Sequence, residues 1–220
     1  MIKIAPSVLT ADFTKLGDEL RILEDIGADM LHLDVMDGVF VPNISFGLRV
    51  VECIRKASSL PLYVHLMITR PQEYIERFAK AGADIIGIHL ESDCDAAACL
   101  KAIRAAGCKS CLTIKPATAA VEIFSLLPLC DMVLIMTVEP GFGGQSFMHD
   151  CIGKATELKA EAARQGLSFD IEVDGGIDGT TAPIAVAAGA NVLVCGSYLV
   201  GADDPAGRMK ALRASYDLLA

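Results

Sequence analysis

A predicted helix passes directly into a predicted strand at Ile26-Gly27-Ala28-Asp29-Met30-Leu31-His32-Leu33-Asp34-Val35. Upstream, apolar residues recur at helical spacing over Thr14–Ile26. Gly27 follows the last of them, where glycine ends a helix at low cost in a left-handed conformation. From Leu31 to Val35 apolar and polar residues alternate, which indicates a strand with two different faces. The segment therefore contains the helix-to-strand junction from which α/β folds are built.

The same helix-ending pattern recurs at Ala81-Gly-Ala-Asp84 and Ala188-Gly-Ala-Asn191, each time before a β-rich run. Eight strands are predicted, with helical patterns between them: Ile2–Ser7, Met30–Val35, Leu62–Met67, Ile85–His89, Ser110–Ile114, Met132–Thr137, Phe169–Val173 and Val192–Cys195. Parallel strands joined by right-handed crossovers close into a barrel when there are eight of them. We therefore predict one domain over residues 1–220, an α/β fold of the (β/α)8 TIM-barrel type. An open doubly wound sheet is the alternative, but no GxGxxG motif follows the first strand.

The composition excludes several classes of function. A hydrophobic content of 53% with 21% charged residues is typical of a packed globular protein. The net charge of −9 argues against nucleic-acid binding, because phosphate backbones would be repelled. We expect no membrane span and no secretory signal, since no long uncharged apolar run and no basic leader is present. Cys108-Lys-Ser-Cys111 is a lone CxxC without a second pair, so we interpret it as structural and expect a cytoplasmic protein.

Polar side chains recur on the inner faces of three predicted strands. His32 and Asp34 alternate with apolar residues on the second strand, His65 lies on the third, and Asp174 follows the seventh. Each alone could equally be a hydrogen-bonded core residue or a helix cap. Together, at the strand ends where barrel enzymes carry their chemistry, two imidazoles and two carboxylates suit one divalent transition metal. We therefore predict these four residues as metal ligands.

Further residues near these strand ends have two possible roles. Glu172 lies one layer deeper than Asp174 and is either a core residue or a partner that orients a ligand. Asp37, before Gly38, is interpreted as a turn residue. Three methionines near strand ends either fill gaps in the packing or line a site from which water is excluded: Met36, Met67 and Met136.

Glycine-rich loops follow the sixth, seventh and eighth strands, at Gly141-Phe-Gly-Gly144, Gly175-Gly176 and Gly196-Ser197. Glycine lets backbone N–H groups approach a ligand closely, and the last two loops are the usual phosphate site of these barrels. Neutral N–H donors also explain how a chain with a charge of −9 could bind a phosphate. The loops therefore predict a phosphorylated substrate.

The sequence closely resembles the ribulose-phosphate 3-epimerase family along nearly the whole chain. The matching segments are Ala5-Pro-Ser7, Ala11-Asp-Phe13, His32-Leu-Asp-Val-Met-Asp-Gly38, Phe40-Val-Pro-Asn43, Val64-His-Leu-Met67, Met136-Thr-Val-Glu-Pro-Gly-Phe-Gly-Gly-Gln-Ser-Phe147, Val173-Asp-Gly-Gly-Ile177 and Gly196-Ser197. The resemblance implies an isomerase of the pentose phosphate pathway that interconverts D-ribulose 5-phosphate and D-xylulose 5-phosphate. It implies a two-base proton transfer at C3 through an enediolate, and a homo-oligomer.

The resemblance also implies roles for individual residues. Asp34 and Asp174 would be the catalytic acid and base and, with His32 and His65, would bind one divalent ion, most often zinc or iron, with manganese or cobalt possible. The three methionines would line the enediolate. The substrate-binding residues it implies are Ser7, His65, Gly141, Phe142, Gly143, Gly144, Asp174, Gly175, Gly176, Gly196 and Ser197.

Three other functions stay open at this point. D-allulose-6-phosphate 3-epimerase acts on a substrate one carbon longer. A related decarboxylase family has an Asp-x-Lys-x-x-Asp signature, but Met36 stands at the lysine position. A non-catalytic phosphosugar-binding barrel should lack one of the four predicted ligands, and none is missing. The chain departs from the family at Val39, often a histidine, at Ser197–Val200, and at His89-Leu-Glu91, which no further histidine follows soon after.

Overall fold

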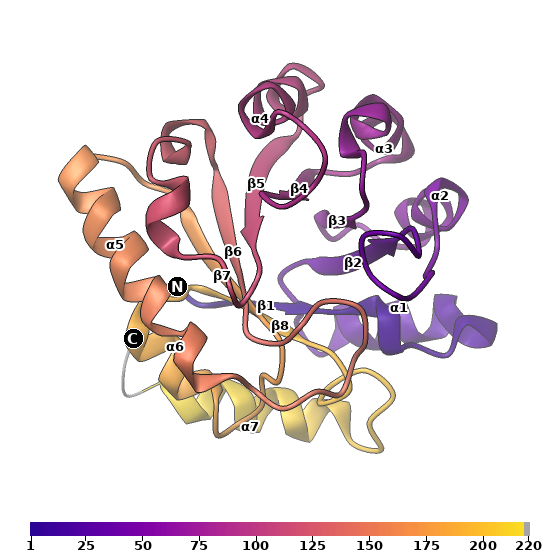
Figure 1. The fold of residues 1–220 in the computed structure, drawn as a ribbon. Coiled ribbons are helices and arrows are strands. Elements are labelled where there is room, and N and C mark those ends of the chain that lie inside the picture. The colour runs from indigo at the N-terminus through magenta and orange to yellow at the C-terminus, as the bar shows by residue number, and fades with distance from the viewer. Residues whose placement is uncertain (218–220) are drawn as a thin grey trace.

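The computed structural model describes residues 1–217, and its eight strands are all parallel (Figure 1). The strands are β1 (Lys3–Pro6), β2 (Leu31–Met36), β3 (Leu62–Met67), β4 (Ile85–His89), β5 (Lys109–Ile114), β6 (Met132–Met136), β7 (Asp170–Asp174) and β8 (Val192–Cys195). Their order is β1-β8-β7-β6-β5-β4-β3-β2, and a parallel bridge between Ser7 and His32 brings β1 back to β2. The predicted (β/α)8 barrel is confirmed. Every predicted strand is present with its ends within one residue of the predicted ones.

The helices lie outside the strands, as Figure 1 shows. They are α1 (Leu16–Asp25), α2 (Leu48–Ala57), α3 (Ile75–Ala81), α4 (Ala96–Ala105), α5 (Gly153–Gln165), α6 (Ala182–Ala188) and α7 (Pro205–Tyr216). The predicted helix Thr14–Ile26 begins instead as a 3₁₀ turn over Phe13–Lys15, capped by Asp12, whose carboxylate accepts a hydrogen bond from the Thr14 N–H. Gly27, Gly82 and Gly189 have positive φ at the helix ends, as the repeated pattern predicts.

The crossover from β5 to β6 differs from the others. It contains two short 3₁₀ turns, Ala120–Ile123 and Leu127–Leu129, in place of an α-helix. Pro128 lies inside the second turn, and a proline removes the N–H that a continuing helix would need there. None of the helices within residues 1–217 is long and apolar enough to cross a membrane.

The strands separate an apolar cluster outside the barrel from a second one inside it. The outer face of β2 carries Leu31, Leu33 and Val35, which pack against the surrounding helices. Inside the barrel, an apolar cluster includes Tyr63 and Leu134, and buried polar side chains lie beside it: Tyr63 pairs in register with His32, and Leu134 pairs with Glu172. Alternation on β2 therefore directs His32 and Asp34 into the barrel, as the sequence predicts, and both are buried.

Candidate active site

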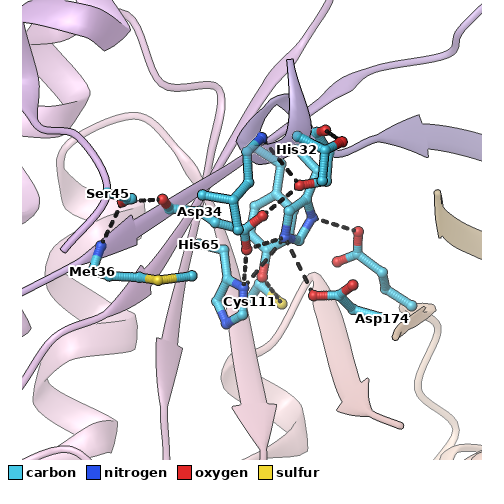
Figure 2. A network of polar contacts seen from close by, with 12 residues as sticks. His32, Asp34, Met36, Ser45, His65, Cys111 and Asp174 are labelled. Carbon is cyan, nitrogen blue, oxygen red and sulfur yellow. Dashed lines mark hydrogen bonds and ion pairs between the residues drawn. The ribbon is translucent and has the colours of Figure 1, made fainter. Parts of the chain in front are cut away.

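The four predicted ligands lie together at the C-terminal end of the barrel. Pairing of β2 with β3 places Asp34 directly beside His65, and Asp174 reaches the same point from β7. Figure 2 shows the side chains of Asp34, His65 and Asp174 converging on the imidazole of His32. One potential ligand atom from each residue lies within 4.8 Å of the other three. The structure thus brings together residues that are up to 142 positions apart, from His32 to Asp174.

The spacing of these atoms fits one small divalent ion. His32 Nε2 and His65 Nδ1 are 3.2 Å apart, and Asp34 Oδ1 lies 3.1 Å from each of them. Asp174 Oδ2 is 3.7 Å from His32 Nε2. Four donors at about 2.0–2.1 Å from a tetrahedral ion would be about 3.3–3.4 Å apart. The donor set, two imidazole nitrogens and two carboxylate oxygens, is therefore close to the size and the chemistry that a divalent transition metal requires.

Neighbouring side chains fix the orientation of two of these residues. Ser7 Oγ donates a hydrogen bond to Asp34 Oδ2 at 2.6 Å, which leaves Oδ1 facing the histidines. His32 Nδ1 lies 3.3 Å from Glu172 Oε1, so a proton on Nδ1 is shared with this carboxylate and Nε2 faces the cluster. Glu172 is fully buried. Of its two sequence-based interpretations, the geometry favours the ligand-orienting one.

A second pair of residues behind the cluster was missed by the sequence analysis. His89, at the end of β4, is fully buried, and its Nε2 lies 2.9 Å from His65 Nε2. Its Nδ1 lies 3.2 Å from Glu91 Oε2. The signal was present as a His-x-Glu sequence at the C-terminal end of a predicted strand, the end at which barrel enzymes carry their chemistry.

Burial and charge set the protonation of the cluster. Burial lowers the pKa of His32, but the charge of Asp34 and its hydrogen bond outweigh this and raise the pKa well above its usual value. Burial raises the pKa of Asp34, but the charges of the two histidines and their hydrogen bonds bring it below its usual range. Burial raises the pKa of Asp174 to about 7 and lowers that of His65 to about 3. Without a metal, Asp34 is therefore ionised near neutral pH, whereas Asp174 is divided between its ionised and protonated forms.

A cavity of about 570 Å³ opens directly above the cluster. The predicted residues that line it are Ser7, Asp34, Met36, Met67, Met136, Gly141, Phe142, Gly143, Gly144, Asp174, Gly175, Gly176, Gly196 and Ser197. His32 and His65 are fully buried and are not part of the lining. Within residues 1–217, Arg208 is the one lysine or arginine of the lining. The sequence analysis did not select it.

The glycines after β7 allow the loops of the cavity to touch. Gly175 and Gly176 have φ values of +123° and +67°, which favour glycine. A Cβ on Gly176 would lie 2.4 Å from the backbone nitrogen of Phe147, in the loop after β6. Glycine is therefore required here both for the backbone conformation and for space. Cys108 and Cys111 are buried free thiols away from this cavity, in line with a structural role.

Comparisons with known proteins agree on one family. A sequence model described as the ribulose-phosphate 3 epimerase family matches residues 3–200. Ribulose-phosphate 3-epimerase of Bacillus subtilis (strain 168) is 46% identical over 216 residues, which cover 98% of this chain and 100% of the relative. Ribulose-5-phosphate-3-epimerase, chloroplastic, of Arabidopsis thaliana is 43% identical and covers 97% of this chain and 77% of the relative.

Solved structures show how widely the barrel is shared. 3-Keto-L-gulonate-6-phosphate decarboxylase from Vibrio cholerae O1 superimposes with a TM-score of 0.74 over 100% of both chains, at 17% identity. At that identity the likeness shows the fold alone.

Proposed function

This chain belongs to the ribulose-phosphate 3-epimerase family, and on that premise we propose that it interconverts D-ribulose 5-phosphate and D-xylulose 5-phosphate through Asp34 and Asp174. The observation that carries the proposal is that both carboxylates line one cavity, from strands β2 and β7. Two other strands, β1 and β8, separate them around the barrel. They therefore approach a bound sugar from different sides, which an inversion at one carbon requires.

The reaction needs one group to remove the C3 proton and another to return a proton to the opposite face. Asp34 is suited to remove it, because Ser7 and the histidines keep this carboxylate ionised. Asp174, with its pKa raised to about 7, is suited to donate. In the reverse direction the two exchange roles. A divalent ion bound by His32, Asp34, His65 and Asp174 would polarise the C2 carbonyl and stabilise the charge that forms when C3 loses its proton. Zinc and iron fit the donor set best, with manganese or cobalt as further candidates.

The remaining cavity walls suit the rest of the substrate. Three methionine side chains, Met36, Met67 and Met136, offer no acidic proton to an enediolate, and each is 4% exposed or less. The glycine loops after β6, β7 and β8 line the same cavity, and we propose that their backbone N–H groups bind the phosphate. Of the predicted binding residues, His65 would act from beneath the cavity.

Other functions are less well supported. The curated relatives act on ribulose phosphate by name, which does not favour the longer D-allulose 6-phosphate. The barrel is shared with a decarboxylase, but Met36 occupies the position of that family's lysine. A non-catalytic role would leave the paired carboxylates unexplained. We further propose that the protein works in the cytoplasm, in keeping with its eight free cysteines. A homo-oligomer is proposed from the family resemblance.

Solvent deuterium exchange tests the proposed chemistry directly. Wild-type protein loaded with zinc, given D-ribulose 5-phosphate in D2O, should form D-xylulose 5-phosphate with deuterium at C3. D34N and D174N should each lose epimerisation by at least about 100-fold, since a positioned proton-transfer group supplies about 10²–10⁴ in rate. Near-native epimerisation by either folded variant would refute the two-carboxylate mechanism. Faster turnover of D-allulose 6-phosphate would overturn the choice of substrate.

A further inference from the structure

The far side of His65 is occupied by a hydrogen-bond chain that the proposed reaction does not use. We call Glu91, His89 and His65 the β4 chain. Within it, His65 Nε2 and His89 Nε2 face each other at 2.9 Å. His89 Nδ1 then faces Glu91 Oε2 at 3.2 Å. Both rings are fully buried and stack at 5.0 Å between centroids. Two facing nitrogens at this distance share a single proton, so one must donate and the other accept.

The position of that proton is decided at Glu91. Its Oε1 accepts hydrogen bonds from the backbone N–H of Lys115, at 2.8 Å, and from the hydroxyl of Thr118. Its Oε2 is thereby directed at His89, and an ionised carboxylate can only accept. His89 must then carry its proton on Nδ1, which leaves Nε2 as an acceptor. His65 in turn carries its proton on Nε2, which leaves Nδ1 without one.

We infer that Glu91 and His89 are positioning residues that fix His65 in the tautomer whose unprotonated Nδ1 faces the four-residue cluster. The inference deepens the proposed function and rests on its metal site. The ring of His32 is oriented from another side, since its Nδ1 faces Glu172 at 3.3 Å and its Nε2 faces the cluster. His65 Nδ1, His32 Nε2 and Asp34 Oδ1 then lie 3.1–3.2 Å from one another, close enough for one cation to bind all three.

Replacing Glu91 by glutamine should reverse the β4 chain. The amide oxygen must occupy the Oε1 position, because the Lys115 N–H can only donate to it. The amide NH2 then faces His89 Nδ1 and donates to it. His89 becomes protonated on Nε2, His65 accepts there, and the His65 proton moves to Nδ1, where it blocks the ligand. A near-isosteric substitution that touches neither cavity nor cluster would thus remove one ligand.

Nitrogen-15 NMR of the imidazole rings reads the tautomers directly. The chain has four histidines, so each ring can be assigned. In wild-type protein, both metal-free and zinc-loaded, His89 should be protonated on Nδ1 and His65 on Nε2. In E91Q both assignments should reverse in the metal-free protein, and zinc affinity, measured by competition with a chelator, should fall by about 10- to 100-fold. E161Q is the matched control, because it neutralises a glutamate on α5 whose side-chain partners, Arg164 and Gln165, lie outside the β4 chain.

The outcomes separate this inference from the proposed function. A wild-type His89 protonated on Nε2 would overturn the inference, even if E91Q did not fold. E91Q with wild-type tautomers and the same zinc affinity as E161Q would also overturn it. Wild-type protein with the expected tautomers but no zinc affinity and no epimerase activity would leave the β4 chain supported and would refute the proposed function instead.

Discussion

Replacing Gly176 by alanine should damage the phosphate end of the cavity far more than it damages the fold. The residue has a φ of +67°, where a non-glycine residue costs about 1–2 kcal/mol. The new Cβ would also lie 2.4 Å from the backbone nitrogen of Phe147, whereas ordinary contact begins at 3.4 Å. The loop after β6 must therefore move by about 1 Å, a displacement that can cost about 100-fold in rate when it misplaces a bound substrate.

Gly166 offers a control with the same backbone angle. It ends α5 with a φ of +67°, and a Cβ there would have no atom within 4 Å. G166A and G176A thus share the backbone cost, expected to lower Tm by about 2–8 °C in a chain of this size. Only G176A should lose kcat/KM, by about 100-fold and mainly through KM. Thermal unfolding and steady-state kinetics on both proteins measure this. Equal kcat/KM for the two folded variants would refute the assignment of Gly176 to the phosphate end.

Three further outcomes are expected. R208M should raise KM several-fold with kcat unchanged, because Arg208 is the one lysine or arginine side chain of the lining in residues 1–217; an unchanged KM would show that Arg208 does not bind the phosphate. L134A should lower the free energy of unfolding by about 2–5 kcal/mol in urea titrations, because its side chain is fully buried inside the barrel; a loss below 1 kcal/mol would contradict that packing. A thiol reagent should modify exposed Cys53 well before buried Cys108 and Cys111 in the native protein, as peptide mapping would show; rapid reaction at the buried pair would contradict their structural role.

The barrel could be predicted because its signals are local. Alternation within β2 and a glycine after each of several helices depend on residues that are neighbours in sequence. The same reasoning predicts helical patterns between all the strands, and between β5 and β6 that prediction is wrong. The segment from Ala119 to Leu129 is rich in apolar residues, but Pro128 lacks the N–H that a continuing α-helix would need, and the segment forms 3₁₀ turns.

The site was predictable only where its residues follow local sequence patterns. His32, Asp34 and His65 lie on strands, where the period of two and the parallel direction tell which side chains can meet. Arg208 lies on α7, and its guanidinium reaches the cavity through contacts with the carbonyl oxygens of Ser197 and Tyr198. Nothing in the sequence around Arg208 specifies that contact, because it depends on how α7 packs beside β8.

Inside the barrel, ionisable groups are buried beside apolar side chains, and this decides which substitutions are informative. Tyr63 belongs to the apolar cluster, and its ring packs edge to face with that of His32 at 4.8 Å between centroids. Burial of the ionisable side chains is offset by hydrogen-bonding partners, as between His32 and Glu172. Truncation of such a side chain to alanine would leave its partner unpaired in a dry environment and would cost stability whatever the catalytic role. Substitutions that keep the shape and change one donor into an acceptor, or the reverse, are the ones that separate chemistry from folding here.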